Sequence, residues 1–302
     1  MMTHLANVEK QVRSVIGNIA GEGVEVGVYA VHYATGREIA VNPDTRFPTA
    51  STVKLPILFA LYRKVATGAL DLADRVTLEA RHRTAGSGVL QDLDLGLQPT
   101  LHDLATLMIT VSDNQATDML YETVGGDYIQ AVAREVGMTN TTTPRTIRAL
   151  LYDLVGMDVA NPEHTYNVNH DRLRTATPNL NGWALGVDDD NDVSTPRDMV
   201  TLLTRIHEGH DPDPKACAAI VNILKRQKFN TIIPLLLPSE IETAHKTGSI
   251  HGVRNDVGLV YAPTSHGGPY AIAIMSRRLE DPIAGARTLA DISRAVWDAF
   301  TA

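Results

Sequence analysis

The 302-residue sequence has little cysteine, few aromatic residues and a deficit of positive charge. The single cysteine, Cys217, cannot form a disulfide within the chain, so stability must come from a buried core, which a chain of this length can build. Lys and Arg number 27 against 35 Asp and Glu, and aromatic residues make up 5%, which disfavours a nucleic-acid partner. No apolar run reaches the roughly 18 residues of a membrane-spanning helix, so we expect no membrane span.

The first twenty residues also lack the pattern of a secretion leader. Charged residues such as Glu9 and Arg13 interrupt the apolar ones, and no small-residue cleavage site follows. The sequence therefore predicts a cytoplasmic protein, unless a leader has been removed. Apolar residues recur at spacings of three and four from Leu5 to Ile19, which predicts an amphipathic helix instead.

Strand patterns stand near both ends of the chain, and helical patterns fill its centre. Segments 24–33 and 37–41 flank a turn and predict a hairpin, and three further strands are predicted at 241–245, 257–261 and 270–275. Helices are predicted at 49–68, 104–111, 118–123, 128–136, 197–207 and 289–300. We therefore expect an α/β protein of the α+β type, with an antiparallel five-stranded sheet flanked by helices.

The helical centre predicts an inserted all-α domain. On this prediction residues 1–47 plus 226–302 form a discontinuous sheet domain, and residues 48–225 form the helical domain. The segment from about 153 to 193 stands apart, because it is rich in Asn, Asp, Thr and His and has little periodicity. It reads as a long irregular loop, with room for short helices, and loops of this length in compact domains are usually functional.

Three short motifs carry residue types that suit nucleophilic catalysis. They are Ser51-Thr52-Val53-Lys54, Ser112-Asp113-Asn114 and Lys246-Thr247-Gly248-Ser249, in that order along the chain. Each alone is a weak signal, because the first serine can be an ordinary helix cap and the second motif can simply end a helix. All three together favour a catalytic serine.

The chemistry of such a site explains the choice of residues. Serine is a weak nucleophile that needs a base beside it, and Lys54 lies one helical turn from Ser51. That lysine can accept a proton only if its pKa is lowered, which burial and a second cation such as Lys246 both do. Ser112 can relay the proton to a leaving nitrogen, and the amide of Asn114 can bind a substrate amide.

The third motif suits a strand that binds substrate. Lys246 and Thr247 can hold a substrate carboxylate, and Gly248 lets another backbone approach closely. The backbone N–H groups of Ser51 and Ser249 can form an oxyanion hole for the reacting carbonyl.

With its motifs and their surroundings, the sequence resembles a class A β-lactamase or a close relative among penicillin-recognising serine hydrolases. Phe47-Pro48-Thr49-Ala50 resembles the family's approach to the nucleophile, and 194–199 resembles the helix start after its omega loop. Segment 252–256 resembles the one in which an arginine, here Arg254, helps to bind the substrate carboxylate. The resemblance covers nearly the whole chain and implies the family's fold of a sheet domain with an inserted helical one. It also implies a Ser51 acyl-enzyme and a small β-lactam, or another acyl amide or ester, as substrate.

We expect no cofactor, no metal and a monomer. His207-Glu208-Gly209-His210 resembles a metal-binding pair, but it has no second cluster with ligand spacing. Gly86-Ser87-Gly88 lacks the lysine and helix of a phosphate loop and is predicted to lie at the rim of the site beside Ser112. His245 and His251 flank the third motif, where strand packing and substrate contact remain open alternatives.

One departure from the family concerns hydrolysis of the acyl-enzyme. Class A enzymes use an omega-loop glutamate, in the pattern E-x-x-L-N, to activate water. The local match is Thr177-Pro178-Asn179-Leu180-Asn181, which has Thr177 in the glutamate position. Glu163 and Asp189 are other candidates, and the position can also be vacant. The sequence therefore leaves three functions open: a β-lactamase, an esterase or D,D-peptidase-like hydrolase with poor β-lactam turnover, and a non-catalytic penicillin-binding relative.

Overall fold

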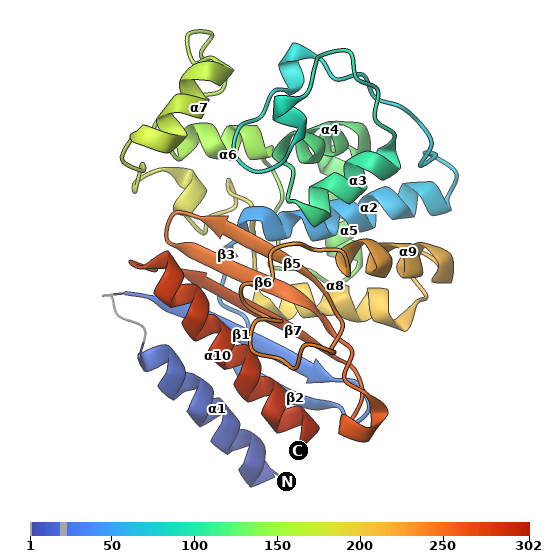
Figure 1. Cartoon of the computed structure of the whole chain (residues 1–302), viewed down its shortest axis with the longest axis vertical. Coiled ribbons are helices and arrows are strands. Elements are labelled where there is room, and N and C mark those ends of the chain that lie inside the picture. Colours follow the sequence, from blue (N-terminus) through green and yellow to red (C-terminus); the bar gives the residue numbers. More distant parts are fainter. Residues whose placement is uncertain (1, 19–22) are drawn as a thin grey trace.

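A five-stranded antiparallel sheet forms the lower half of the molecule in the computed structural model, which describes residues 2–18 and 23–302 (Figure 1). The strand order is β2-β1-β7-β6-β5, so the N-terminal hairpin pairs with the C-terminal strands through β1 and β7. This confirms the predicted sheet. Its strands are β1 (Glu25–His32), β2 (Arg37–Val41), β5 (Thr243–Ile250), β6 (Val253–Val260) and β7 (Tyr270–Arg277).

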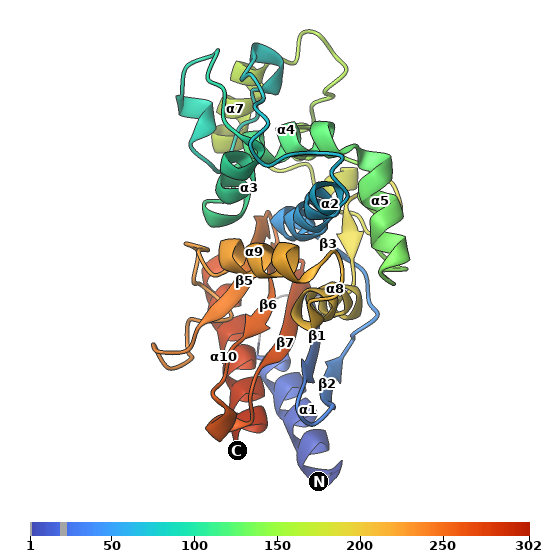
Figure 2. The same cartoon turned by 90° about the vertical axis from the view of Figure 1, so that its right-hand side faces the viewer.

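Helices cover both faces of the sheet (Figure 2). Helices α1 (Met2–Gly17) and α10 (Pro282–Thr301) pack together on one face, and α8 (Pro196–Glu208) packs on the other against β1, β6 and β7. Strand alternation explains the two layers, because Ile272 and Ile274 lie in the apolar cluster of α10, whereas Ala273 and Met275 lie in that of α8. The N-terminal helix is confirmed up to Gly17, and Ile19 lies outside the described residues.

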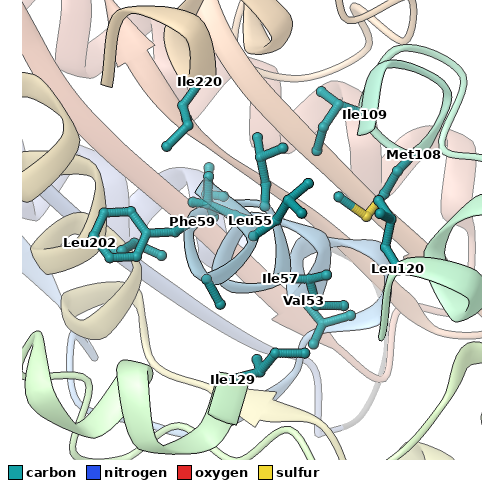
Figure 3. Close-up of a cluster of buried hydrophobic side chains, with 14 of the residues drawn as sticks. Val53, Leu55, Ile57, Phe59, Met108, Ile109, Leu120, Ile129, Leu202 and Ile220 are labelled. Carbon is teal, nitrogen blue, oxygen red and sulfur yellow. The ribbon is translucent and has the colours of Figure 1, made fainter. Parts of the chain in front are cut away.

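Four of the remaining helices, α3, α4, α5 and α9, pack around α2, whose apolar side chains point in several directions into one core (Figure 3). Leu55, Ile57 and Phe59 are almost fully buried there, which a helix can achieve only when other elements surround it. The helices of this upper half are α2 (Lys54–Ala66), α3 (Leu101–Thr110), α4 (Asn114–Val124), α5 (Gly126–Glu135), α6 (Ile147–Asp153), α7 (Tyr166–Thr175) and α9 (Pro214–Leu224).

Two sequence-based expectations need adjustment. The helix predicted over 49–68 is a 3₁₀ turn, η1 (Ala50–Val53), followed by α2. The segment 153–193 is irregular for much of its length, yet it contains α7 and the short turn η4 (Trp183–Leu185). It closes where β4 (Val193–Ser194) pairs with β3 (Phe47–Pro48).

The division into domains at residues 47 and 225 remains a prediction. Helix α8 falls inside the predicted helical domain by sequence but packs against the sheet. Among the described residues, no helix is long and apolar enough to cross a membrane.

Candidate active site

Ser51 lies on the η1 turn and lines a cavity of about 540 Å³ beside β5, the edge strand of the sheet. The segment before it is held firmly, because the N–H and hydroxyl of Thr49 both donate to the Asp192 carbonyl at 2.9 Å. Ala50 has a φ of 46°, a left-handed conformation that a residue with a Cβ rarely adopts. The strained turn therefore presents the predicted nucleophile to the cavity.

Lys54 is fully buried at the start of α2, and its ammonium group reaches the second motif. Its Nζ donates to the Ser112 carbonyl at 2.7 Å, the Ser112 Oγ at 3.0 Å and the Asn114 Oδ1 at 2.8 Å. Burial lowers the pKa of Lys54 well below its usual range, and the nearby charge of Lys246 lowers it further. The structure therefore gives this lysine the property that a general base requires.

Lys246 approaches the same hydroxyl from the sheet. Its Nζ donates to the Ser112 Oγ at 3.1 Å and to the Thr247 carbonyl at 2.7 Å, and its side chain is fully buried. Burial lowers the pKa of Lys246 to about 7, although the charge of Asp256 acts in the opposite direction. The Ser112 hydroxyl thus lies between the Nζ atoms of two lysines that come from different halves of the chain.

The position of Ser112 depends on a sharp turn between α3 and α4. Ser112 has a φ of 55°, and Asp113 then caps α4 by accepting from the Ala116 N–H. The same Asp113 carboxylate also accepts from the backbone N–H groups of Val89 and Leu90, at 2.7 and 2.9 Å. These bonds tie the loop around Gly88 to the second motif.

Ser87, beside Gly88, forms part of the rim of the cavity. Its hydroxyl donates to the Ser112 carbonyl at 2.7 Å, and its side chain lines the cavity. The predicted place of the Gly86-Ser87-Gly88 segment beside Ser112 is confirmed. Gly88 is required there, because a Cβ at this position would lie 2.3 Å from the Asp113 carboxyl carbon.

The third motif forms the opposite side of the cavity. A Cβ on Gly248 would lie 2.7 Å from the Thr49 carbonyl, so only glycine lets β5 pack against η1. Asn255, on the neighbouring β6, reinforces this contact by donating to the carbonyls of Pro48 and Thr49, at 2.9 and 3.0 Å. The sequence analysis missed Asn255, because its place beside η1 follows only from the strand register.

The other predicted binding residues differ in exposure. Thr247, Ser249 and Arg254 line the cavity, whereas Asn114 is buried just behind it and donates to the Ala85 carbonyl. The half-buried Arg254 is held by donating to the carbonyls of Ile250 and Val253, at 2.8 and 2.7 Å.

The proposed deacylation residues do not join this cluster. Thr177 and Glu163 are both exposed, and neither lines the cavity. Asp189 is exposed too and pairs with Arg46 at 2.7 Å. Among the described residues that line the cavity of Ser51, none carries a carboxylate.

Other titratable groups give no sign of a metal centre. Within residues 2–18 and 23–302, no three or more His, Cys, Asp or Glu side chains come together as metal ligands would. His207 stacks on Tyr33 with ring centroids 4.0 Å apart, which accounts for part of the His207–His210 motif by packing.

Comparison with known proteins assigns this arrangement to a family. The family model described as "Beta-lactamase enzyme family" matches residues 7–300, nearly the whole chain. The chain belongs to the β-lactamase enzyme family. This membership confirms the resemblance seen in the three motifs.

Individual relatives agree with the assignment. A β-lactamase of Bacillus licheniformis is 27% identical over 256 residues, which cover 84% of this chain and 72% of that protein. The crystal structure of a β-lactamase from Sphaerobacter thermophilus is 30% identical, with a TM-score of 0.77, and the match covers 99% of this chain and 98% of the other.

The solved structures similar to this chain also include that of PBP-A. It is 27% identical, with a TM-score of 0.79, and the match covers 97% of this chain and 96% of the other. A mutant of PBP-A, 28% identical with a TM-score of 0.77 over 98% of this chain and 96% of the other, is described as an acyl-enzyme complex with penicillin G. The fold of this chain is therefore shared by β-lactamases and by a protein that penicillin acylates.

Proposed function

We propose that this protein is a serine acyl hydrolase that β-lactams acylate at Ser51 and that releases the acyl group slowly. One observation carries the proposal. The Ser112 hydroxyl accepts hydrogen bonds from two buried lysines, Lys54 at 3.0 Å and Lys246 at 3.1 Å. Buried lysines with lowered pKa values are costly for a fold, and such groups cluster at functional sites.

The proposed acylation uses these groups in sequence. Lys54 in its neutral form accepts the Ser51 proton while the Ser51 Oγ bonds to the carbonyl carbon of the amide. When the C–N bond breaks, the proton passes from Lys54 through the Ser112 hydroxyl to the leaving nitrogen. The product is an ester of Ser51 and a free amine, and the lysine returns to its neutral form.

Binding groups surround the reacting carbonyl. The proposed oxyanion hole consists of the backbone N–H groups of Ser51 and Ser249, on η1 and β5. Thr247 and Arg254 are proposed to hold the substrate carboxylate, and both line the cavity. No cofactor takes part in this scheme.

Slow release follows from the lining of the cavity. Hydrolysis of the ester needs a base that activates water, and the described lining residues include no carboxylate. Thr177 and Glu163, the residues predicted for that role, point to solvent elsewhere on the long loop. PBP-A is about as similar in sequence to this chain as the β-lactamases are. A PBP-A mutant is described as an acyl-enzyme complex with penicillin G, which supports a long-lived adduct as one possible behaviour of this fold.

Intact-mass spectrometry after incubation with benzylpenicillin tests the proposal. We expect the protein mass to rise by the full mass of the antibiotic, and the adduct to persist for many minutes. Ser51→Ala should give no adduct, whereas Ser265→Ala, which alters a serine on an exposed turn, should be acylated like the unchanged protein.

The alternatives give different results in the same assay. A wild-type adduct that disappears within seconds, together with rapid nitrocefin hydrolysis, would establish an efficient β-lactamase. Rapid cleavage of a para-nitrophenyl ester with a persistent penicillin adduct would favour the esterase or D,D-peptidase-like function. A protein that forms no adduct at all would contradict the proposal.

A further inference from the structure

The cavity of Ser51 extends beyond the motif residues to an apolar wall that none of the motifs explains. Phe229 and Leu235 each keep 42% of their surface exposed, and Ile283 keeps 83%. They come from two separate segments, the loop before β5 and the start of α10, and converge on one cavity. The apolar wall consists of Phe229, Leu235, Pro282, Ile283 and Ala286.

Strand geometry shows which part of the catalytic site the apolar wall adjoins. Side chains alternate along β5, so Lys246 and Gly248 face η1 and the second motif, while Thr247 and Ser249 face the opposite side. Arg254 is the register partner of Ser249 and therefore shares its face. Figures 1 and 2 show α10 and the loop before β5 on this side of the sheet.

The loop that carries Phe229 and Leu235 is held in place by hydrogen bonds from β6 and α10. Asp256, which is fully buried and opposite Thr247, accepts from the Ile233 N–H at 2.9 Å. The other Asp256 oxygen lies 2.8 Å from the His245 Nδ1, and the Ser293 hydroxyl of α10 donates to the Ile233 carbonyl at 2.9 Å. The apolar wall is therefore preformed, as a binding subsite needs to be.

The charges around the apolar wall select the sign of its ligand. Arg254 and Arg287 line the same cavity, and the described lining residues include no carboxylate to balance them. The cavity thus offers cations and apolar surface together, which suits an anion with an apolar neighbour.

We propose that the apolar wall is a subsite for the leaving-group side of the substrate, and that it selects amides whose leaving group carries an aromatic or branched aliphatic substituent next to its carboxylate. This inference rests on the proposed function. In a β-lactam the carboxylate is attached beside the leaving nitrogen, so a carboxylate held by Arg254 directs its neighbouring substituent to the wall. The acyl side chain lies on the other side of the scissile bond.

The test compares two cephalosporins that share one acyl side chain. They differ only in the substituent on the ring carbon next to the one that bears the carboxylate, which is a hydrogen in one compound and a styryl group in the other. The rate of Ser51 adduct formation is measured for each, and their ratio reports the subsite. We expect the wild-type protein to prefer the styryl compound by about tenfold.

Two variants remove parts of the apolar wall, Phe229→Ser and Ile283→Asn, and each should reduce that preference by about three- to tenfold. Val159→Asn serves as the matched control, because Val159 is 41% exposed on the long loop and does not line the cavity. It should leave both rates and their ratio unchanged. Phe229, Ile283 and Val159 are all exposed, so we expect these substitutions to leave the folding of the protein intact.

Three outcomes are distinguishable. A preference that falls in both wall variants but not in the control supports the subsite. Adducts on Ser51 without a wild-type preference, or with a preference that the wall variants leave intact, overturn the subsite while the proposed function stands. Absence of any adduct with either compound overturns the proposed function and the subsite together.

Discussion

The motif cluster and the long loop of residues 153–193 differ in the exposure of the side chains predicted to act in catalysis. In the cluster, Lys54 and Lys246 are buried and each donates to groups of the neighbouring motifs. In the loop, candidate acids such as Glu163 face solvent. In the proposed function the first region supplies the groups for acyl transfer to Ser51, whereas the second places no carboxylate in the cavity to activate the water that would hydrolyse the acyl-enzyme. On this proposal, the two regions correspond to acylation and to deacylation.

Hydrogen bonds from buried asparagine side chains to backbone carbonyls nonetheless hold the loop in place. The Asn191 amide donates to the carbonyls of Ala184 and Gly186, at 3.1 and 2.8 Å, and Asn169 donates to the Leu151 carbonyl at 3.1 Å. These side chains stabilise the conformation of the loop, and none of these bonds reaches the cavity of Ser51. Order in this loop is therefore no indication of a catalytic role.

Removal of the proposed base tests the motif cluster with the largest expected effect. In Lys54→Met the acylation rate of Ser51 should fall by about 10²–10⁴-fold, because a positioned general base typically contributes that factor. This rate is measured by quenching the reaction at successive times and determining the acylated fraction by mass spectrometry. Lys225→Met is the matched control, since this half-buried lysine pairs with Glu242, lies over the Tyr261 ring and does not line the cavity of Ser51. It should change the rate by less than about twofold. Equal rates in Lys54→Met and wild type would refute the assigned base.

The second lysine offers a test through pH. The nearby charge of Lys246 lowers the pKa of Lys54, so Lys246→Ala should raise that pKa. Acylation requires the neutral form of Lys54, and its rate should therefore begin to rise only at a higher pH in the variant than in wild type. The maximal rate should also fall by about ten- to a hundredfold, through loss of a substrate-binding cation. The acylation rate is measured as a function of pH for both proteins. If the rate of the variant rises over the same pH range as that of the wild type, Lys246 does not affect the pKa of Lys54.

The sequence predicted the cluster better than the loop for physical reasons. Ser51 and Lys54 are three residues apart on one local turn, and the pairing of Lys246 with Ser112 follows once the edge strand is placed beside the inserted helices. Strand alternation and helical periodicity also gave the five strands and most helices to within a few residues. These features depend on local patterns, which a single sequence contains.

The features that were missed depend on side chains brought together by tertiary contacts. Asn255 and Asp256 stand in a strand as ordinary polar residues, and only the register shows that one secures η1 and the other the loop before β5. Phe229 and Ile283 are 54 positions apart (283 − 229) and meet at the cavity only because α10 returns along the sheet. No spacing rule connects such residues.

Asp192 lies at the neck of the long loop, directly before β4, and offers a test of stability instead of reaction rate. Asp192 is fully buried, and only its Oδ1 has a partner among the described residues, the Arg145 N–H at 3.1 Å. Burial raises its pKa to about 8, and the charge of Asp118 adds to this effect. Because the folded-state pKa lies above the usual value of 3.8, the wild type should lose stability as pH rises from about 4 through 8, by up to about 1.4 kcal/mol per pH unit.

Asp192→Asn removes that titration and keeps an oxygen for the Arg145 N–H. The variant should therefore gain stability relative to wild type as pH rises between about 4 and 8, with a constant difference above that range. Urea unfolding at several pH values measures the difference. A difference that does not change with pH would show that Asp192 is ionised in the folded protein, and that the neck tolerates a buried charge.

The smallest expected effect completes the comparison, because it asks whether the long loop takes any part in deacylation. Glu163 and Thr177 are exposed and lie outside the cavity of Ser51, so Glu163→Gln and Thr177→Ala should change the lifetime of the penicillin adduct by less than about twofold. The decay of the adduct mass over time measures this lifetime. A tenfold longer lifetime in Glu163→Gln would mean that the loop moves a carboxylate into the cavity after acylation. The contrast between the two regions would then describe the free protein only, and slow release would have to be attributed to the cost of that movement.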